Sequence, residues 1–221
     1  MSVRPPIRFV IFDSDGVLVD SEALGTRALV EEAAKYGYDV SVADGMPIFR
    51  GLKMAESFAI IERRIGRPLP ASFAADYRAV EAGLFEQHLR AVPGVEAVLR
   101  ALAVPFCVAS NGPRAKIDRA LRVTGLAPLF GEGRVFCAYE VGSWKPDPGL
   151  FLAAARHAGV PPAACAVVED SRPGVRAGLA AGMQVFGFAA TDEAADELAA
   201  EGAQVVRTMS ELQGWLPTRA G

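Results

Sequence analysis

The stretch FVIFDSDGVLVDSE, residues 9–22, begins as an apolar run and then places four acidic side chains within ten positions. The apolar run does not alternate with polar residues, which predicts a strand buried on both faces. The acidic residues that follow it are Asp13, Asp15, Asp20 and Glu22. Carboxylates this close repel one another, and each is costly to remove from water. A bound cation and an anionic substrate would explain the cluster.

Further short apolar runs predict more strands of the same kind. Together with residues 8–12 they lie at 104–109, 135–138, 165–168, 183–188 and 203–206. Helical patterns at 114–123, 149–159 and 173–182 lie between the later runs, and each is followed by or ends at a glycine. Strands that alternate with helices indicate an α/β fold with a doubly wound, Rossmann-like parallel sheet and right-handed crossovers.

The first connection is too long for an ordinary crossover. About 90 residues separate Asp13 from the next strand near Val104, whereas a complete crossover unit needs about 30. Within this segment, helical patterns lie at 21–36, 53–65 and 71–91, and the crossover helix is expected at 91–102. We therefore predict a discontinuous catalytic core, residues 1–18 and 91–221, with a helical cap, residues 19–90, inserted after strand one.

Composition limits the classes of partner. The net charge of −3 at pH 7 argues against nucleic acid and anionic membranes, which both need a basic surface. Three cysteines in apolar stretches are typical of small buried side chains in a reducing compartment. The N-terminus has too short an apolar run for a signal peptide, and no segment is long enough for a membrane span. We expect a cytoplasmic protein, and a monomer or weak homodimer.

Polar residues follow four of the predicted strands, at the edge where open parallel sheets bind ligands. After strands one and two lie Asp13-Ser14-Asp15-Gly16 and Ser110-Asn111-Gly112. After strands three and four lie the loop with Lys145 and the segment Glu169-Asp170-Ser171. A single aspartate after a strand is usually a turn or helix-cap residue. Four such strand ends together indicate a site.

These four motifs resemble those of the haloacid dehalogenase-like hydrolase superfamily. DSDGVLVDSE is similar to its first motif, SNG to its second, the lysine of WKPDP to its third and EDS to its fourth. The helical insertion after the first motif resembles the β-phosphoglucomutase-like subgroup. Within it, SNGP, WKPDP and FRGLKM look like the bacterial phosphatases that accept 6-phosphogluconate or small sugar phosphates.

Phosphoryl transfer explains the charged residues of the core. A phosphate monoester repels nucleophiles, so catalysis depends on positioning and charge neutralisation. Asp13 is the candidate nucleophile, which would form an aspartyl-phosphate. Asp15, two residues on, could protonate the leaving oxygen and then activate water. Lys145 would balance the carboxylates and the transferring group.

The resemblance also implies a magnesium ion, a hard cation that carboxylates and substrate phosphate hold well. Asp13 and Asp170 would bind it through their side chains and Asp15 through its backbone carbonyl, with Glu169 as a ligand or close neighbour. The phosphoryl oxygens would be held by Ser110 and by the backbone N–H groups that follow, at Asn111 and Gly112.

Three alternatives are weighed against this phosphatase. A dehalogenase of the family lacks the second aspartate, so Asp15 argues against that activity. A mutase of the subgroup carries a histidine where this chain has Gly25, and a cap arginine where it has Met54. Arg50 and Lys53 are the candidate cap contacts to an anionic substrate. A catalytically idle binding protein is the third alternative, but it has no reason to keep so costly a charge cluster.

Overall fold

The structure, a computed structural model, describes residues 5–49, 52 and 54–219. The chain divides into two compact units. The core unit comprises Met1–Val19 and Ala91–Gly221, and the helical unit comprises Asp20–Arg90. Arg50 and Lys53, the two candidate cap contacts, lie outside the described residues.

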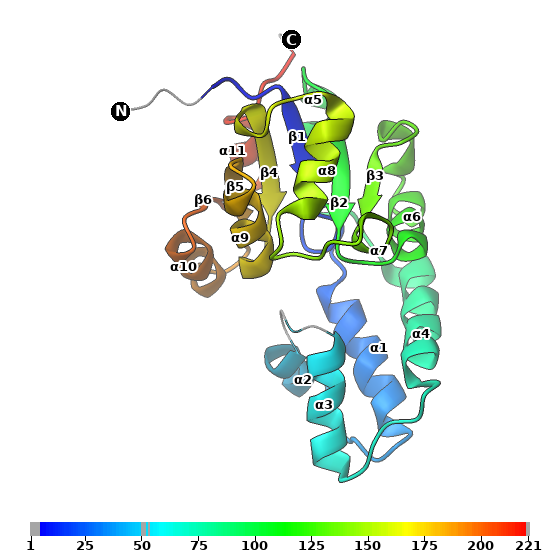
Figure 1. The fold of residues 1–221 in the computed structure, drawn as a ribbon. Helices are drawn as coiled ribbons and strands as arrows, with labels where there is room; N and C mark the ends of the chain where they lie inside the picture. Colours follow the sequence, from blue (N-terminus) through cyan, green and yellow to red (C-terminus); the bar gives the residue numbers. More distant parts are fainter. Residues whose placement is uncertain (1–4, 50–51, 53, 220–221) are drawn as a thin grey trace. The chain divides into compact units, whose positions relative to one another are not determined.

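The core unit is built on a parallel sheet (Figure 1). Within the described residues it has six strands in the order β3-β2-β1-β4-β5-β6. The strands are β1 (Phe9–Phe12), β2 (Phe106–Ser110), β3 (Val135–Cys137), β4 (Cys165–Glu169), β5 (Gln184–Phe188) and β6 (Gln204–Val206). The chain reverses its direction of travel across the sheet between β3 and β4, so β1 and β4 are neighbours at the centre. The predicted doubly wound α/β fold is confirmed.

The central strands are buried on both faces, as their unbroken apolar runs predict. On one face, Phe9 and Ile11 belong to the same apolar cluster as Leu150 of helix α8 (Gly149–Ala158). Phe12 has the opposite parity along the strand and contacts Phe106 edge to face, with ring centroids 6.2 Å apart. Both faces of β1 are therefore buried, and the burial continues past its carboxyl end to Asp13 and Ser14.

The remaining helices of the core unit follow the strands along the chain. They are α5 (Val95–Ala101), α6 (Arg114–Val123), α7 (Ala138–Val141), α9 (Arg172–Ala180), α10 (Asp192–Ala200) and α11 (Met209–Gln213), with short 3-10 turns at Ala127–Leu129 and Pro162–Ala164. Helix α6 has the same bounds as its sequence pattern. The pattern did not predict α7, α10 and α11. Two of these have five residues or fewer, too short for a helical period to register.

The helical unit contains α1 (Glu22–Ala34), α2 (Val42–Phe49), α3 (Met54–Ile65) and α4 (Phe73–His88). Helix α2 was not predicted, because it contains Gly45 and Pro47, both poor helix formers. Packing favours it nonetheless: a Cβ on Gly45 would lie 3.0 Å from a methyl group of Val30. The glycine thus permits α2 to approach α1 closely, and the burial gained offsets its low helix propensity.

Two expectations about the bulk of the chain can be compared with the structure. Cys107, Cys137 and Cys165 are free and buried, as predicted for small core side chains. Among the described residues, none of the helices has the length and apolar character that crossing a membrane requires.

Candidate active site

A tight turn at the carboxyl end of β1 presents the first two candidate residues. The Asp13 N–H donates to the Val168 carbonyl of β4 at 2.9 Å, which continues the sheet by one residue. Beyond it, the N–H groups of Leu18 and Val19 both donate to the Ser14 carbonyl and fold the chain back. Asp13 therefore remains buried, at 7% exposure, while Asp15 is on the outer part of the turn.

Gly16 makes this turn possible for two reasons. Its φ of +74° lies in the left-handed region, which side chains with a Cβ avoid. A Cβ at this position would also lie 1.9 Å from an Asp170 carboxylate oxygen, far inside contact distance. The glycine that follows the acidic pair therefore admits Asp170 of a distant motif. The sequence interpretation assigned it no role, although it belongs to the D-x-D-G pattern.

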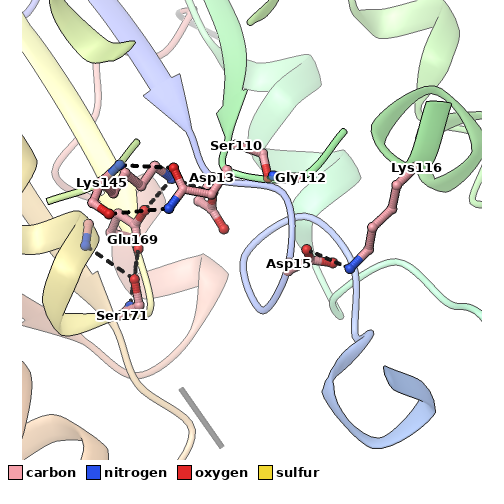
Figure 2. A network of polar contacts seen from close by, with 10 residues as sticks. Asp13, Asp15, Ser110, Gly112, Lys116, Lys145, Glu169 and Ser171 are labelled. Carbon is pink, nitrogen blue, oxygen red and sulfur yellow. Dashed lines mark hydrogen bonds and ion pairs between the residues drawn. The ribbon is translucent and has the colours of Figure 1, made fainter. Parts of the chain in front are cut away.

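Three motifs meet at one buried ammonium group (Figure 2). The Lys145 side chain is 3% exposed, and its Nζ donates to Asp13 Oδ1 and to Glu169 Oε1. Its Nζ also lies 5.0 Å from the ring centroid of Phe151 in α8. Lys145 thus joins the loop after β3 to the ends of β1 and β4, across 132 and 24 residues of sequence.

The electrostatics of this cluster follow from its burial. Burial, with Glu169 and Asp15 nearby, raises the pKa of Asp13 to about 7 despite the attraction of Lys145. Burial likewise raises the pKa of Asp170 well above its ordinary range, and Glu169 and Asp13 add to the effect. For Lys145, burial acts to lower the pKa, but Asp13 and Glu169 outweigh it and raise the pKa. Lys145 therefore remains protonated. The carboxyl groups around it, when ionised, carry more negative charge than its single positive charge can neutralise.

The donors in this cluster suit a hard divalent cation. One carboxylate oxygen from each of Asp13, Glu169 and Asp170 lies within 4.8 Å of the other two. Carboxylate oxygens are the ligands that such cations prefer, and a second positive charge would offset the burial and the repulsion that raise the pKa values of Asp13 and Asp170. Asp170 is less buried than the other two. The residues present therefore fit a metal site.

The Asp15 carboxylate lies outside the buried cluster and pairs with a second lysine. Its carboxylate forms an ion pair with Lys116 Nζ at 3.1 Å, and in Figure 2 the two side chains point toward each other. Lys116 is in the first turn of α6, directly after the SNG motif. Sequence analysis missed Lys116. Its position one helical turn after a strand-end motif was the available signal.

The SNG motif contributes a folded loop at the end of β2. Ser110 is buried, and its hydroxyl accepts a hydrogen bond from the Gly112 N–H at 3.1 Å. Asn111 is turned to the neighbouring loop: its Oδ1 accepts from the Lys145 N–H at 2.9 Å, and its Nδ2 donates to the Lys145 carbonyl at 3.4 Å. Its amide therefore fixes the backbone that carries Lys145, a role that the sequence interpretation did not give it.

Comparisons with known proteins indicate the family of this chain. Residues 7–182 match the family model described as haloacid dehalogenase-like hydrolase. A 6-phosphogluconate phosphatase from Escherichia coli (strain K12) is 37% identical over 185 residues, which cover 83% of each chain.

Solved structures give the same result. A hydrolase from Deinococcus radiodurans R1 of the same family, with bound phosphate and sodium, is 30% identical, with a TM-score of 0.79 and coverage of 97% of this chain and 99% of that one. A Thermotoga maritima protein described as a β-phosphoglucomutase is 25% identical, with a TM-score of 0.78 and coverage of 94% and 97%. This chain belongs to the haloacid dehalogenase-like hydrolases.

Proposed function

We propose that this protein is a magnesium-dependent phosphatase that hydrolyses a small, sugar-type phosphate monoester through an aspartyl-phosphate. The observation that carries the proposal is the buried cluster of Asp13, Lys145, Glu169 and Asp170, with Asp15 two residues beyond the nucleophile. A charge cluster of this kind is unfavourable in a fold unless a cation and an anionic substrate complete it.

Each residue has a distinct part in the proposed reaction. Asp13 attacks phosphorus and accepts the phosphoryl group, and Asp15 gives a proton to the departing sugar oxygen. Asp15 then takes a proton from the water that hydrolyses the aspartyl-phosphate. The Lys145 ammonium group and the loop at Ser110 and Gly112 hold the negative oxygens of the group in transfer.

The metal ion would be held by the carboxylates of Asp13 and Asp170 and the backbone carbonyl of Asp15, with Glu169 beside it. When bound, magnesium neutralises charge on the phosphoryl oxygens and on the nucleophile. Its identity as magnesium is part of this proposal, supported by the all-oxygen donor set.

The substrate class rests on two kinds of support. The FRGLKM and SNGP segments resemble sugar-phosphate phosphatases, and the E. coli relative is named for 6-phosphogluconate. We propose that residues 19–90 act as a cap that recognises the leaving group, with Arg50 and Lys53 as contacts to an anionic sugar acid. We further propose a cytoplasmic enzyme that is a monomer or weak homodimer.

A substrate panel tests this proposal. Release of inorganic phosphate would be measured from 6-phosphogluconate, hexose 6-phosphates, hexitol phosphates and phosphoglycolate, with Mg²⁺ and with EDTA. We expect turnover of at least one sugar-type ester, its loss in EDTA and its return with excess Mg²⁺. Hydrolysis that persists in EDTA would refute the metal's role. Failure of every ester in Mg²⁺ would instead favour an idle binding protein on the same fold.

The reaction product distinguishes a phosphatase from the alternative, a mutase. Gly25 lies in α1 and offers no side chain for proton transfer, and a Cβ there would lie 3.7 Å from Glu81 Oε1. With β-glucose 1-phosphate we therefore expect glucose and inorganic phosphate. Net formation of glucose 6-phosphate would overturn the assignment as a phosphatase.

A further inference from the structure

The hydroxyl of Ser171 lies at the junction between the charge cluster and a helix. Glu169 is fully buried and needs donors for both carboxylate oxygens. Oε1 accepts from Lys145. Oε2 accepts from the Ser171 hydroxyl at 2.8 Å and from the Ser171 N–H at 3.1 Å. Among the described residues, Ser171 thus supplies both of the donors that Oε2 of Glu169 receives.

The same hydroxyl also caps α9. Ser171 is the N-cap residue of that helix, and its Oγ accepts from the Gly174 N–H at 3.2 Å. Because this oxygen accepts from the helix, its own proton is directed to Glu169. A continuous chain of hydrogen bonds therefore runs from the first turn of α9 through Ser171, Glu169 and Lys145 to Asp13 (Figure 2).

Gly174 leaves room for this chain of hydrogen bonds. A Cβ on Gly174 would lie 1.9 Å from the carboxyl carbon of Glu169 and 2.0 and 2.2 Å from its two oxygens. The carboxylate therefore packs directly against the helix backbone and cannot shift toward α9. With Lys145 on one side and Ser171 on the other, its orientation is determined by contacts on three sides.

We propose that Ser171 is a positioning residue for phosphoryl transfer: its hydroxyl orients Glu169, which holds the Lys145 ammonium group against Asp13. This inference rests on the proposed phosphatase function, since it assigns to Ser171 a role in that same site. The hydrogen bonds of the Ser171 hydroxyl join it to Glu169 and Gly174, so its proposed effect on Asp13 is transmitted through Glu169.

A merely structural role is the alternative, because any N-cap serine stabilises its helix. Thr191 provides the matched control. It caps α10, which like α9 has nine residues, and its hydroxyl accepts from the Ala194 N–H at 3.2 Å. Thr191→Ala removes an equivalent cap after β5, outside the four motifs. Ser171→Ala removes a cap and, in addition, the hydroxyl donor to Glu169.

The experiment compares Ser171→Ala, Ser171→Thr and Thr191→Ala with the unaltered enzyme in Mg²⁺. Both alanine variants should lower the midpoint of thermal unfolding, Ser171→Ala by at least as much as Thr191→Ala, because it also loses a hydrogen bond to a buried carboxylate. Only Ser171→Ala should lose kcat, by about 10- to 100-fold as is typical when a group that orients a catalytic ligand is removed. KM should change little, because Ser171 does not touch substrate. Ser171→Thr keeps a hydroxyl that can cap and donate, and should restore most of the loss.

A second measurement does not depend on turnover. Crystal structures of the two alanine variants should show Glu169 and Lys145 displaced from Asp13 in Ser171→Ala and unchanged in Thr191→Ala. Equal kcat in the two variants overturns the inference, and so does an unmoved Glu169 in Ser171→Ala. If the unaltered enzyme hydrolyses no phosphate ester, the proposed function fails, and the crystal structures still decide whether Ser171 positions Glu169 and Lys145.

Discussion

Replacing the proposed nucleophile should abolish activity and at the same time stabilise the metal-free protein. Asp13→Asn keeps the shape of the side chain and an oxygen that can accept from Lys145, but it cannot ionise. Asparagine is also too weak a nucleophile to form an acyl-phosphate. We therefore expect no release of phosphate above the background rate. The gain in stability follows from the charge that is removed.

The magnitude comes from the pKa of Asp13. Burial raises this pKa from 3.8 to about 7, and each unit corresponds to about 1.4 kcal/mol, so ionising Asp13 in the folded state costs about 4 kcal/mol. The attraction of Lys145 is already contained in this shift, so replacing the charged group by a neutral amide should give a net gain of about 2–4 kcal/mol at pH 8.

The contribution of Asp13 to the free energy of unfolding changes with pH in the opposite direction to that of a salt-bridged surface aspartate. The folded protein binds the Asp13 proton more tightly than the unfolded chain, so the unaltered protein loses stability as pH rises from about 4 to 7. Asp13→Asn does not. The advantage of the variant should therefore be only about 1–2 kcal/mol at pH 5 and reach its full value above pH 7.

Urea unfolding in EDTA at pH 5 and pH 8 measures both values. Asp147→Asn is the control: this exposed carboxylate accepts from Ser143 and from the Gly149 N–H, which lower its pKa. The control should give no gain at pH 8. An Asp13→Asn protein that is less stable at pH 8, or whose advantage is the same at both pH values, would refute the reasoning.

Three further changes test the packing around the site and in the helical unit. Lys145→Met leaves Asp13 and Glu169 without their shared cation and should lower the free energy of unfolding by about 3–5 kcal/mol at pH 8; urea unfolding in EDTA should show a smaller loss at pH 5, where Asp13 holds a proton. Gly16→Ala would place a Cβ 1.9 Å from Asp170 Oδ2, so we expect loss of kcat and a higher Mg²⁺ concentration for half-maximal turnover, and an unchanged Mg²⁺ dependence would contradict this. Gly83 in α4 has open space around it, and Gly83→Ala should raise the free energy of unfolding by about 0.5–1 kcal/mol, whereas a less stable variant would show that a methyl group is not tolerated there.

Local patterns were enough to predict most of the fold. Unbroken apolar runs identify strands buried on both faces, and each of the six runs overlaps a strand of the sheet, with bounds that differ by one or two residues. Helices with a strong apolar period, such as α6, were also predicted. In the helical unit the pattern failed where packing opposed local propensity: α2 forms despite Gly45 and Pro47 because the glycine allows a close approach to Val30.

The candidate site, like the fold, could be predicted in part from the sequence. The residues Asp13, Asp15, Ser110, Lys145 and Asp170 could be chosen from sequence alone, because parallel strands place their carboxyl ends at one edge and each motif directly follows a strand or its loop. The sequence also sufficed to indicate the family and the kind of chemistry, since a cluster of carboxylates with one lysine favours phosphoryl transfer with a metal.

Pairings between distant residues were decided only by the tertiary structure. No sequence pattern identified Asp15 as the partner of Lys116, the Lys145 backbone as the partner of Asn111, or Asp170 as the side chain for which Gly16 makes room. Periodicity reports which face of an element is buried, but not which atoms of two elements meet. The sequence by itself therefore determined the sheet and the acidic residues at the carboxyl edge that we propose as the site. The three-dimensional packing decided which lysine pairs with which carboxylate. Hydrogen bonds and steric exclusion act over a few ångströms, and they join segments that are far apart in the chain.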